Sequence, residues 1–332
     1  MQKILIIQTA FIGDVVLATA VVEKIKAYLP DAKIDFLLRK GNENLLNNNP
    51  HINEVLIWVK KENKIKNLFS IIKKIRKTKY DKVINLQRFF ATGLITALSG
   101  ATETIGFDKN PLSFFFSKKI KHIISTSVPY KHEVERNNDL IKDFTDVSIN
   151  KPKLYPSEKD FEKTRQYTDH LYISITPSSV WFTKQYPIEK WIEFINAVPQ
   201  NYRIYLLGGP DNKKECEAIR EQCLNKNVIT LAGELNFLQS AALMKSAIMN
   251  YVNDSAPLHF ASGMNAPVTA VFCSTLPAFG FTPLSDRSFV IETKETLACR
   301  PCGLHGKKEC PLKHFKCGFG IETNQLLATL SA

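Results

Sequence analysis

The stretch MQKILIIQTAFIGDVVLATAVVEKIKAY, residues 1–28, decides the fold. Its first seven residues form a short apolar run, which predicts a buried parallel strand. The residues after Asp14 are rich in Ala and Leu and carry charge only from Glu23 onward, which predicts a helix. Gly13 lets the backbone bend between the two elements. The order of strand, tight turn and helix is typical of a parallel α/β sheet.

Asp14 lies in this first turn, and two interpretations of it are open. Ligands of open α/β sheets collect at the carboxyl ends of the strands, so a carboxylate there is well placed to meet a substrate. Asp is also a frequent helix cap. Local spacing does not separate the two roles, and the rest of the chain has to decide between them.

Strand and helix signals then alternate along both halves of the chain, which predicts α/β architecture with right-handed crossovers. We expect two doubly wound sheets of about five strands each. Residues 108–130 mix aromatic and basic side chains and are expected to form a mobile flap or a surface loop. Residues 148–157 contain Pro152 and Pro156 without a clear period, which indicates a linker between two domains.

Composition limits the function classes. A chain of 332 residues is expected to form about two domains. Residues 1–150 hold 24 Lys and Arg against 15 Asp and Glu, so most of the net charge of +12 lies in the first half. This favours acidic partners such as phosphates, acidic sugars or an anionic membrane. No apolar run is long enough to predict a transmembrane helix. The seven cysteines do not suggest a secreted disulfide scaffold, so we expect a cytoplasmic protein.

Two loops of the second half have the composition of anion-binding sites. Ser178 and Ser179 follow a predicted strand, and Lys184 precedes a helix. Hydroxyl groups, a lysine and free N–H groups at a helix start suit a phosphate, although an ordinary surface lysine is the simpler alternative. In the second loop Asp254 or Ser255 can cap a helix that carries Pro257 in its first turn. His259 would then lie one turn into that helix.

Other glycine-containing turns do not match nucleotide-binding fingerprints. Gly208-Gly209-Pro210-Asp211 lacks the G-x-G-x-x-G spacing, and the turn at residues 8–14 lacks it too. A P-loop is also absent from the sequence. These absences weaken a dinucleotide-dependent oxidoreductase and a nucleoside triphosphatase.

Four cysteines near the end of the chain, Cys299, Cys302, Cys310 and Cys317, leave two interpretations open. Four thiolates can hold a structural zinc ion, but the short middle spacing is unlike that of common zinc ribbons. Reduced cysteines in a loop beside the site are the favoured alternative.

Residues 60–79 predict a basic amphipathic helix with nine Lys and Arg and one acidic residue. A solvated face explains this pattern, and so does attraction to an anionic membrane or a polyanionic acceptor. No recognisable nucleic-acid-binding module is present, so nucleic acid is not an expected partner.

The chain resembles the ADP-heptose:lipopolysaccharide heptosyltransferases, glycosyltransferase family 9, over nearly its whole length. Four stretches carry the likeness in the family's order: residues 12–17 (IGDVVL), 177–191, 231–235 (LAGEL) and 253–259 (NDSAPLH) followed by Ala261. Each stretch is weak alone, and together they are specific to the family.

The resemblance implies a GT-B fold, in which two Rossmann-like doubly wound domains face each other across a cleft. Residues 1–155 are then expected to bind the acceptor and residues 156–332 the nucleotide-sugar, and the last helix is free to cross back to the N-terminal domain. The implied reaction moves a heptose or a related sugar, with inversion and without a metal, from a donor such as ADP-heptose to the lipopolysaccharide inner core. This phosphorylated, acidic lipid A–core acceptor agrees with the basic first half and with peripheral contact at the inner face of the cytoplasmic membrane.

The resemblance also implies roles for single residues. Asp14 falls on the catalytic base, and Lys184 falls on a residue that stabilises the leaving phosphate. The residues expected at the donor are Ser178, Ser179, Asp211, Asp254, Ser255, Ala256 and His259. Ala256 stands where a glycine is usual, and residues 273–275 (CST) stand where Gly-Pro-Thr is common, which leaves the donor open.

Two alternative functions are kept. One is a non-catalytic protein that binds a sugar nucleotide or a glycan on the same fold, against which Asp14 and Lys184 both argue. The other is a dinucleotide-dependent oxidoreductase, which the missing glycine fingerprint disfavours. No cofactor is expected.

Overall fold

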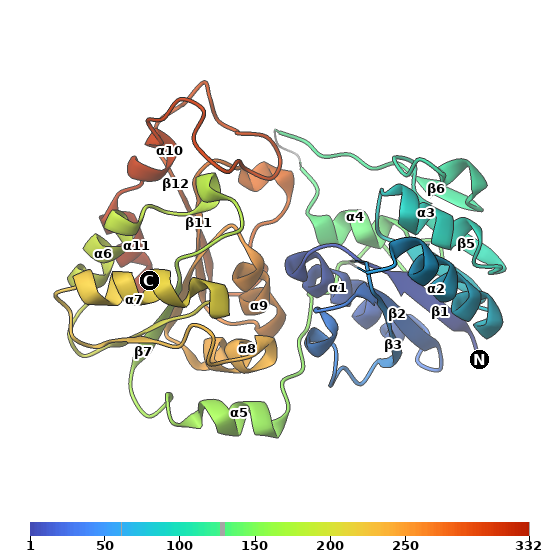
Figure 1. The fold of residues 1–332 in the computed structure, drawn as a ribbon, viewed down its shortest axis with the longest axis horizontal. Coiled ribbons are helices and arrows are strands. Elements are labelled where there is room, and N and C mark those ends of the chain that lie inside the picture. Colours follow the sequence, from blue (N-terminus) through green and yellow to red (C-terminus); the bar gives the residue numbers. More distant parts are fainter. Residues whose placement is uncertain (61, 127–129, 332) are drawn as a thin grey trace. The chain divides into compact units, whose positions relative to one another are not determined.

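The computed structural model describes residues 1–60, 62–126 and 130–331 (Figure 1). Contacts divide the chain into two compact units, of which the first is Met1–Ile124 with Lys131–Tyr155 and the second is Ser125–Tyr130 with Pro156–Ala332. Each unit contains one six-stranded parallel sheet with helices between the strands. The predicted α/β class with doubly wound sheets is confirmed, and the roles of the two halves stay predictions.

The sheet of the first unit has the strand order β3-β2-β1-β4-β5-β6. Its strands are β1 (Lys3–Ile7), β2 (Lys33–Arg39), β3 (Ile52–Trp58), β4 (Lys82–Asn85), β5 (Glu103–Phe107) and β6 (Lys118–Ile120). Its helices are α1 (Ile12–Tyr28), α2 (Lys64–Thr78), α3 (Phe90–Ala97) and α4 (Glu133–Asp139), with short 3₁₀ turns η1 (Glu43–Leu45) and η2 (Ser113–Phe115).

The sheet of the second unit has the order β12-β11-β10-β7-β8-β9. Its strands are β7 (Tyr172–Thr176), β8 (Arg203–Leu206), β9 (Val228–Thr230), β10 (Met249–Asn253), β11 (Val268–Phe272) and β12 (Ser288–Glu292). Its helices are α5 (Glu158–Arg165), α6 (Ile188–Ala197), α7 (Lys213–Gln222), α8 (Phe237–Ser246), α9 (Ala256–Met264), α10 (Lys316–Phe319) and α11 (Thr323–Ser331). The 3₁₀ turns are η3 (Phe182–Lys184), η4 (Pro210–Asn212) and η5 (Pro277–Phe279).

Each sheet has one strand more than the five we expect from the sequence. In the first unit the extra strand is β6, which lies where we expect a flap or loop and pairs in parallel with β5. The ring of Phe116 is buried over Gly106, where an added Cβ would lie 2.6 Å from the ring. This contact packs the segment that leads into β6 against β5. The local sequence pattern of residues 118–120 does not predict it. In the second unit the extra strand is β12.

The last helix belongs to the second unit. α11 packs against α6 and β12, within the second unit. The buried side chains of Leu326 and Leu330 join the same core cluster as Trp191 and Phe194 of α6. The apolar face of α11 is therefore satisfied within its own unit.

The central strand of the first unit is buried on both faces, as a parallel strand between two helical layers should be. Leu5 and Ile7 belong to a core cluster with side chains of α2 and α3. Ile4 and Ile6 point to the other face and are also fully buried. α1 is buried along nearly its whole length and packs against α4. The helix that carries Asp14 is therefore held in place by packing along most of its length.

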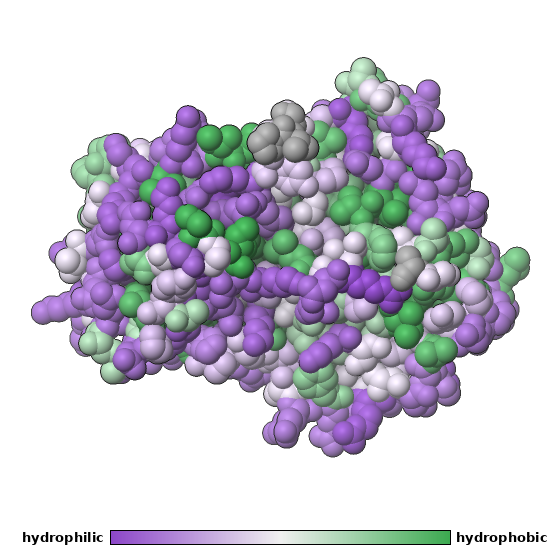
Figure 2. Space-filling model, turned by 180° about the vertical axis from the view of Figure 1, so that it is seen from behind, coloured by the Kyte–Doolittle hydropathy of each residue, from purple (hydrophilic) through white to green (hydrophobic). Residues whose placement is uncertain are grey.

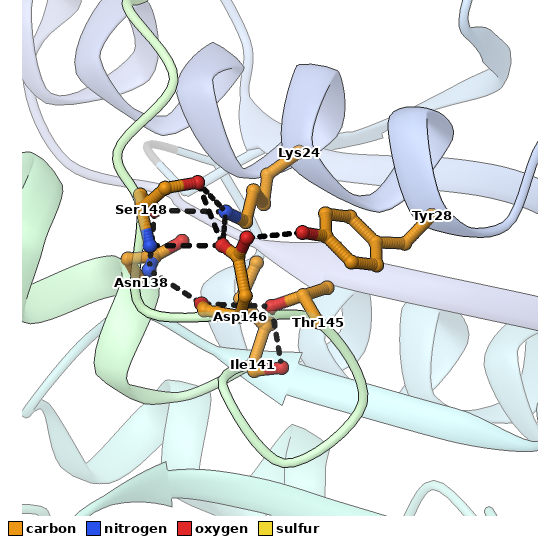
Figure 3. A network of polar contacts seen from close by, with 7 residues as sticks. All are labelled: Lys24, Tyr28, Asn138, Ile141, Thr145, Asp146 and Ser148. Carbon is orange, nitrogen blue, oxygen red and sulfur yellow. Dashed lines mark hydrogen bonds and ion pairs between the residues drawn. The ribbon is translucent and has the colours of Figure 1, made fainter.

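A buried lysine anchors the distal half of α1 (Figure 3). Lys24 is 1% exposed, and its ammonium group pairs with Asp146 and donates hydrogen bonds to the carbonyl oxygen of Ser148 at 2.8 Å and its hydroxyl at 2.5 Å. Tyr28 donates a hydrogen bond to the same carboxylate. Buried charges are tolerated when they are paired and hydrogen-bonded. The network ties α1 to residues 146–148.

No helix in the described part of the chain is both long and apolar enough to cross a membrane. On the face turned away from the view of Figure 1, hydrophobic residues lie in patches between hydrophilic ones (Figure 2).

Candidate functional site

Each sheet has one point at which the strand order reverses, and most of the predicted site residues lie in the loops beside it. In the first unit this point lies between β1 and β4, and in the second it lies between β7 and β10. Ligands of open α/β sheets bind outside the carboxyl ends of the strands at such a point. Asp14 follows β1, Lys184 follows β7, and Asp254 follows β10.

Asp14 is half-buried in the first turn of α1, where it does cap the helix. Its Oδ2 accepts a hydrogen bond from the backbone N–H of Phe11 at 3.2 Å. No side chain among the described residues donates a hydrogen bond to this carboxylate. Capping therefore engages one oxygen, and the carboxylate keeps capacity for a further donor.

The surroundings of Asp14 favour its protonated form. Burial, followed by the charge of Glu133, raises the pKa of Asp14 to about 6, although the Phe11 amide and Arg88 act in the opposite direction. A carboxylate with a pKa near 6 is a stronger base than an ordinary aspartate and is mostly ionised at neutral pH. This is the property that a general base needs.

Glu133 was not identified from the sequence. It lies in the first turn of α4, is 8% exposed, and its Oε2 accepts a hydrogen bond from Nε of Arg136 at 2.8 Å. Burial raises the pKa of Glu133 even beside this guanidinium group. The only sequence signal is a Glu and an Arg three residues apart, which is common on helices and does not indicate that Asp14 is nearby.

In the second unit a lysine and a carboxylate from neighbouring loops form an ion pair. Lys184 Nζ lies 2.7 Å from Asp254 Oδ2, and the two side chains are 15% and 8% exposed. Thr275 Oγ1, from the loop after β11, donates a hydrogen bond to the same oxygen at 2.6 Å. The structure thus brings together two predicted residues and adds Thr275, the one residue of the segment 273–275 that agrees with the common Gly-Pro-Thr pattern.

The other predicted residues of this unit differ in their hydrogen bonds and in their exposure. The hydroxyl of Ser178 donates to Glu215 Oε2 in α7 at 2.5 Å, so it is engaged within the protein. Ser179 is half-buried, and its carbonyl oxygen accepts a hydrogen bond from Gln185 Nε2 at 2.6 Å. Asp211 is exposed in η4, after β8.

Of the two cap candidates Asp254 and Ser255, the structure has Ser255 as the N-cap residue of α9, but its side chain does not cap the helix. Its hydroxyl instead donates to the carbonyl oxygen of Asn253 at 3.4 Å. Ala256 and Pro257 open the helix, and His259 is buried one turn further. A helix start that its own cap residue leaves unsatisfied suits a phosphate group.

The four clustered cysteines are free thiols. The Sγ atom of Cys299 lies 3.9 Å from Nε2 of His314. Burial and the neighbouring Cys299 and Cys310 raise the pKa of Cys302. Within the residues that the structure describes, no three His, Cys, Asp or Glu side chains are arranged to hold a metal ion.

Comparison with known proteins agrees on one family. The family model described as glycosyltransferase family 9 (heptosyltransferase) matches residues 68–315. The chain is 30% identical over 278 residues to lipopolysaccharide heptosyltransferase 3 of Escherichia coli K12, covering 79% of this chain and 80% of that protein.

Two solved structures share the fold. A glycosyl transferase of family 9 from Veillonella parvula superposes with a TM-score of 0.83 at 20% identity, covering 99% of this chain and 96% of that one. The E. coli ADP-heptose lipopolysaccharide heptosyltransferase II superposes with a TM-score of 0.80 at 20% identity, covering 99% and 98%.

Replacing Asp14 by Asn tests the raised pKa through stability. We expect Asp14→Asn to raise the free energy of unfolding at pH 7.5 by about 2–3 kcal/mol, because each unit of pKa shift corresponds to about 1.4 kcal/mol. In the wild type, the ionised Asp14 carboxylate destabilises the folded state, and this destabilisation is fully present above pH 6. It declines as the pH falls from 6 to 3.8 and vanishes below, where the carboxyl group is protonated in both the folded and the unfolded state.

Urea unfolding at pH 7.5 and pH 3.5 measures this difference, with Asp31→Asn at an exposed position as the matched control. Equal effects of Asp14→Asn at both pH values would contradict the raised pKa.

Proposed function

This chain belongs to glycosyltransferase family 9, the heptosyltransferases, and on that premise we propose that it transfers a heptose from ADP-heptose to the inner core of lipopolysaccharide. The ion pair of Lys184 and Asp254 at the switch point of the second sheet is the observation that carries the donor site. The names of the relatives support the choice of sugar and acceptor.

We assign the acceptor to the first unit and the nucleotide-sugar to the second. A group of cations borders the turn that carries Asp14. Lys60 Nζ donates hydrogen bonds to the carbonyl oxygen and hydroxyl of Thr9 at 2.9 and 2.8 Å, and the guanidinium group of Arg39 lies 5.0 Å from the ring centre of Phe11. Burial and the charges of Arg39 and Lys64 lower the pKa of Lys60 to about 8. Such a group favours a phosphorylated, acidic acceptor such as the lipid A–core.

In the proposed mechanism Asp14 is the general base of a single displacement. Its carboxylate takes the proton of an acceptor hydroxyl while that oxygen attacks the anomeric carbon from the face opposite the diphosphate. The new glycosidic bond forms as the bond to the diphosphate breaks, so the anomeric configuration inverts. Proton transfer of this kind contributes about 10²–10⁴ to the rate.

The second unit stabilises the leaving group. Lys184 places a positive charge beside the developing negative charge of the diphosphate, and the N–H groups at the start of α9 add hydrogen bonds. Ser179, Ser255 and His259 line the phosphates, while Asp211 reaches the ribose. Ser178 supports this loop through Glu215, and Ala256 leaves little bulk where the phosphate approaches.

We expect no divalent metal in the reaction, because a lysine supplies the positive charge that the diphosphate needs. The cysteines of the C-terminal cluster are expected to remain reduced thiols rather than to bind zinc, because the short spacing between Cys302 and Cys310 is unlike that of common zinc ribbons.

We further propose peripheral contact with the anionic inner face of the cytoplasmic membrane. α2 buries Leu68, Ile71, Ile72 and Ile75 but leaves Ile65 and Phe69 exposed among its lysines. An apolar pair within a basic helix suits an anionic lipid surface.

We expect the protein to co-sediment with phosphatidylglycerol vesicles and not with phosphatidylcholine vesicles. Phe69→Asp should weaken binding to phosphatidylglycerol. Equal binding to both lipids would contradict an electrostatic contact.

Removal of the base should abolish turnover while donor binding persists. Asp14→Asn is expected to lower kcat by about 10²–10⁴ and to leave the affinity for ADP unchanged. In the wild type, kcat/KM should fall below pH 6 as the carboxylate is protonated. A pH–rate profile and calorimetry with ADP measure both, and transfer at the wild-type rate by Asp14→Asn would overturn the mechanism.

Removal of the lysine should act mainly on the donor. Lys184→Ala is expected to weaken ADP binding and to lower kcat by about 10–100-fold, since a charge-assisted hydrogen bond contributes about 1.5–3 kcal/mol. Lys190→Ala, which removes a partly exposed lysine that is paired with Glu193 on α6, is the matched control. Unchanged donor kinetics of Lys184→Ala would remove this residue from the site.

Removal of Lys60 should act on the acceptor instead. Lys60→Ala is expected to raise KM for the lipid acceptor about tenfold, with no change in ADP affinity, because only the acceptor's phosphate loses a charged partner. Lys33→Ala is the control, because Lys33 begins β2 and so lies at the opposite end of this strand from Arg39. A shift in ADP affinity, or none in acceptor KM, would count against this assignment.

A further inference from the structure

The cysteine-containing segment between β12 and α10 has no role in the proposed mechanism, yet it is bonded to the loops that form the donor site. Lys307 exchanges two hydrogen bonds with Thr183: its N–H donates to Thr183 Oγ1 at 2.7 Å, and its carbonyl oxygen accepts from the Thr183 N–H at 3.1 Å. The N–H of Cys302 donates to the carbonyl oxygen of Ser274 at 2.9 Å. The segment therefore touches both the turn before Lys184 and the loop before Thr275.

Thr183 is the point at which these contacts meet. It is 1% exposed and directly precedes Lys184. Besides the bond from Lys307, its Oγ1 accepts a hydrogen bond from the hydroxyl of Ser274 at 3.0 Å. One threonine hydroxyl thus joins η3, the loop after β11 and the cysteine-containing segment.

The same segment forms a wall beside the lysine side chain. A Cβ added to Gly306 would lie 2.9 Å from Cγ of Lys184 and 3.0 Å from Thr183 Oγ1, so the Gly306 backbone lies close against both. Lysine has a long flexible stem, and a wall along it restricts the directions in which the ammonium group can point.

The partner of the ion pair is held from the same side. Asp254 accepts from Thr275, and the carbonyl oxygen of Thr275 accepts a hydrogen bond from Nη2 of Arg300 at 2.8 Å. The same Nη2 lies 3.1 Å from the carbonyl oxygen of Phe272 at the end of β11. Arg300 to Lys307 therefore supports both members of the pair Lys184–Asp254, one through Thr183 and the other through Thr275.

We propose that Thr183 is a positioning residue for the donor site, which holds the Lys184 ammonium group in place by fastening η3 to the segment Arg300–Lys307. This inference rests on the proposed function, in which Lys184 meets the donor diphosphate. Thr183 itself is buried and acts through the lysine. A catalytic group loses effect when its support is loosened by a fraction of an ångström to an ångström.

The test is a double-mutant cycle of Thr183→Val with Lys184→Ala in the full chain. Val keeps the shape of Thr but removes both hydrogen bonds to Oγ1. We expect Thr183→Val to lower kcat/KM for ADP-heptose about tenfold, Thr183→Ser to restore most of it, and Thr183→Val to add no further loss in the Lys184→Ala background. Thr164→Val, which removes another buried hydrogen-bonded hydroxyl in α5, should leave kcat/KM unchanged.

Two results would overturn the proposal: wild-type donor kinetics in Thr183→Val, or an equal loss in the wild-type and Lys184→Ala backgrounds, which would indicate general loosening of the fold. Thermal unfolding of each variant identifies misfolding. Measuring ADP affinity for the same four proteins gives a second double-mutant cycle that does not depend on turnover. An inactive wild type would contradict the proposed function instead, whereas an active wild type with an unaffected Thr183→Val contradicts only the positioning role.

Discussion

The candidate site of the second unit depends on one buried ion pair. Lys184 and Asp254 are each less than one-fifth exposed, so both have lost most of their hydration. In a buried ion pair this desolvation cost can exceed the mutual attraction unless further hydrogen bonds support the pair. The remaining stabilisation comes from Thr275 on the carboxylate and from the wall of backbone along the lysine stem. A pair that is held this way fixes the position of the Lys184 ammonium group before any ligand arrives, and such preorganisation is what transition-state stabilisation requires.

The two units place polar groups by the same geometric rule, although their chemistry differs. In each sheet the strand order reverses next to the first strand of the unit, and the loops on either side of that reversal carry the candidate residues. The first unit offers a half-buried carboxylate with a raised pKa, next to cations that suit an acidic acceptor. The second unit offers a lysine and a free helix start that suit a diphosphate. The base that we propose in one half and the anion binding that we propose in the other match the two tasks of glycosyl transfer, which are to activate the acceptor and to stabilise the leaving group.

The sequence predicts much of this arrangement because parallel strands and their crossover helices leave strong local signals. The apolar run before Asp14 and the alternation in both halves are enough to predict two doubly wound sheets. β6 is missed because three residues with no apolar pattern become a strand only through β5 and the contact of Phe116 with Gly106. The sequence leaves open what the last helix packs against, because it shows an apolar face of α11 but not the surface that covers this face.

The site shows the same division between local and distant contacts. Asp14 is found from its place in a turn, but its raised pKa depends on burial and on Glu133, which lies 119 positions further along the chain. The sequence identifies Lys184 and Asp254 separately, while their pairing depends on the adjacency of β7 and β10. Ser178 is predicted at the donor from its place in the loop, and its hydrogen bond to Glu215 is not predicted, because no local signal indicates the partner of a loop serine.

The most direct test of the account is incubation of the purified chain with ADP-heptose and a heptose-deficient lipid A–core acceptor, followed by mass spectrometry and NMR of the product. The account predicts an acceptor that has gained one heptosyl residue whose anomeric configuration is inverted relative to the donor, together with free ADP. An unchanged acceptor, or a product that retains the configuration of the donor, would contradict it.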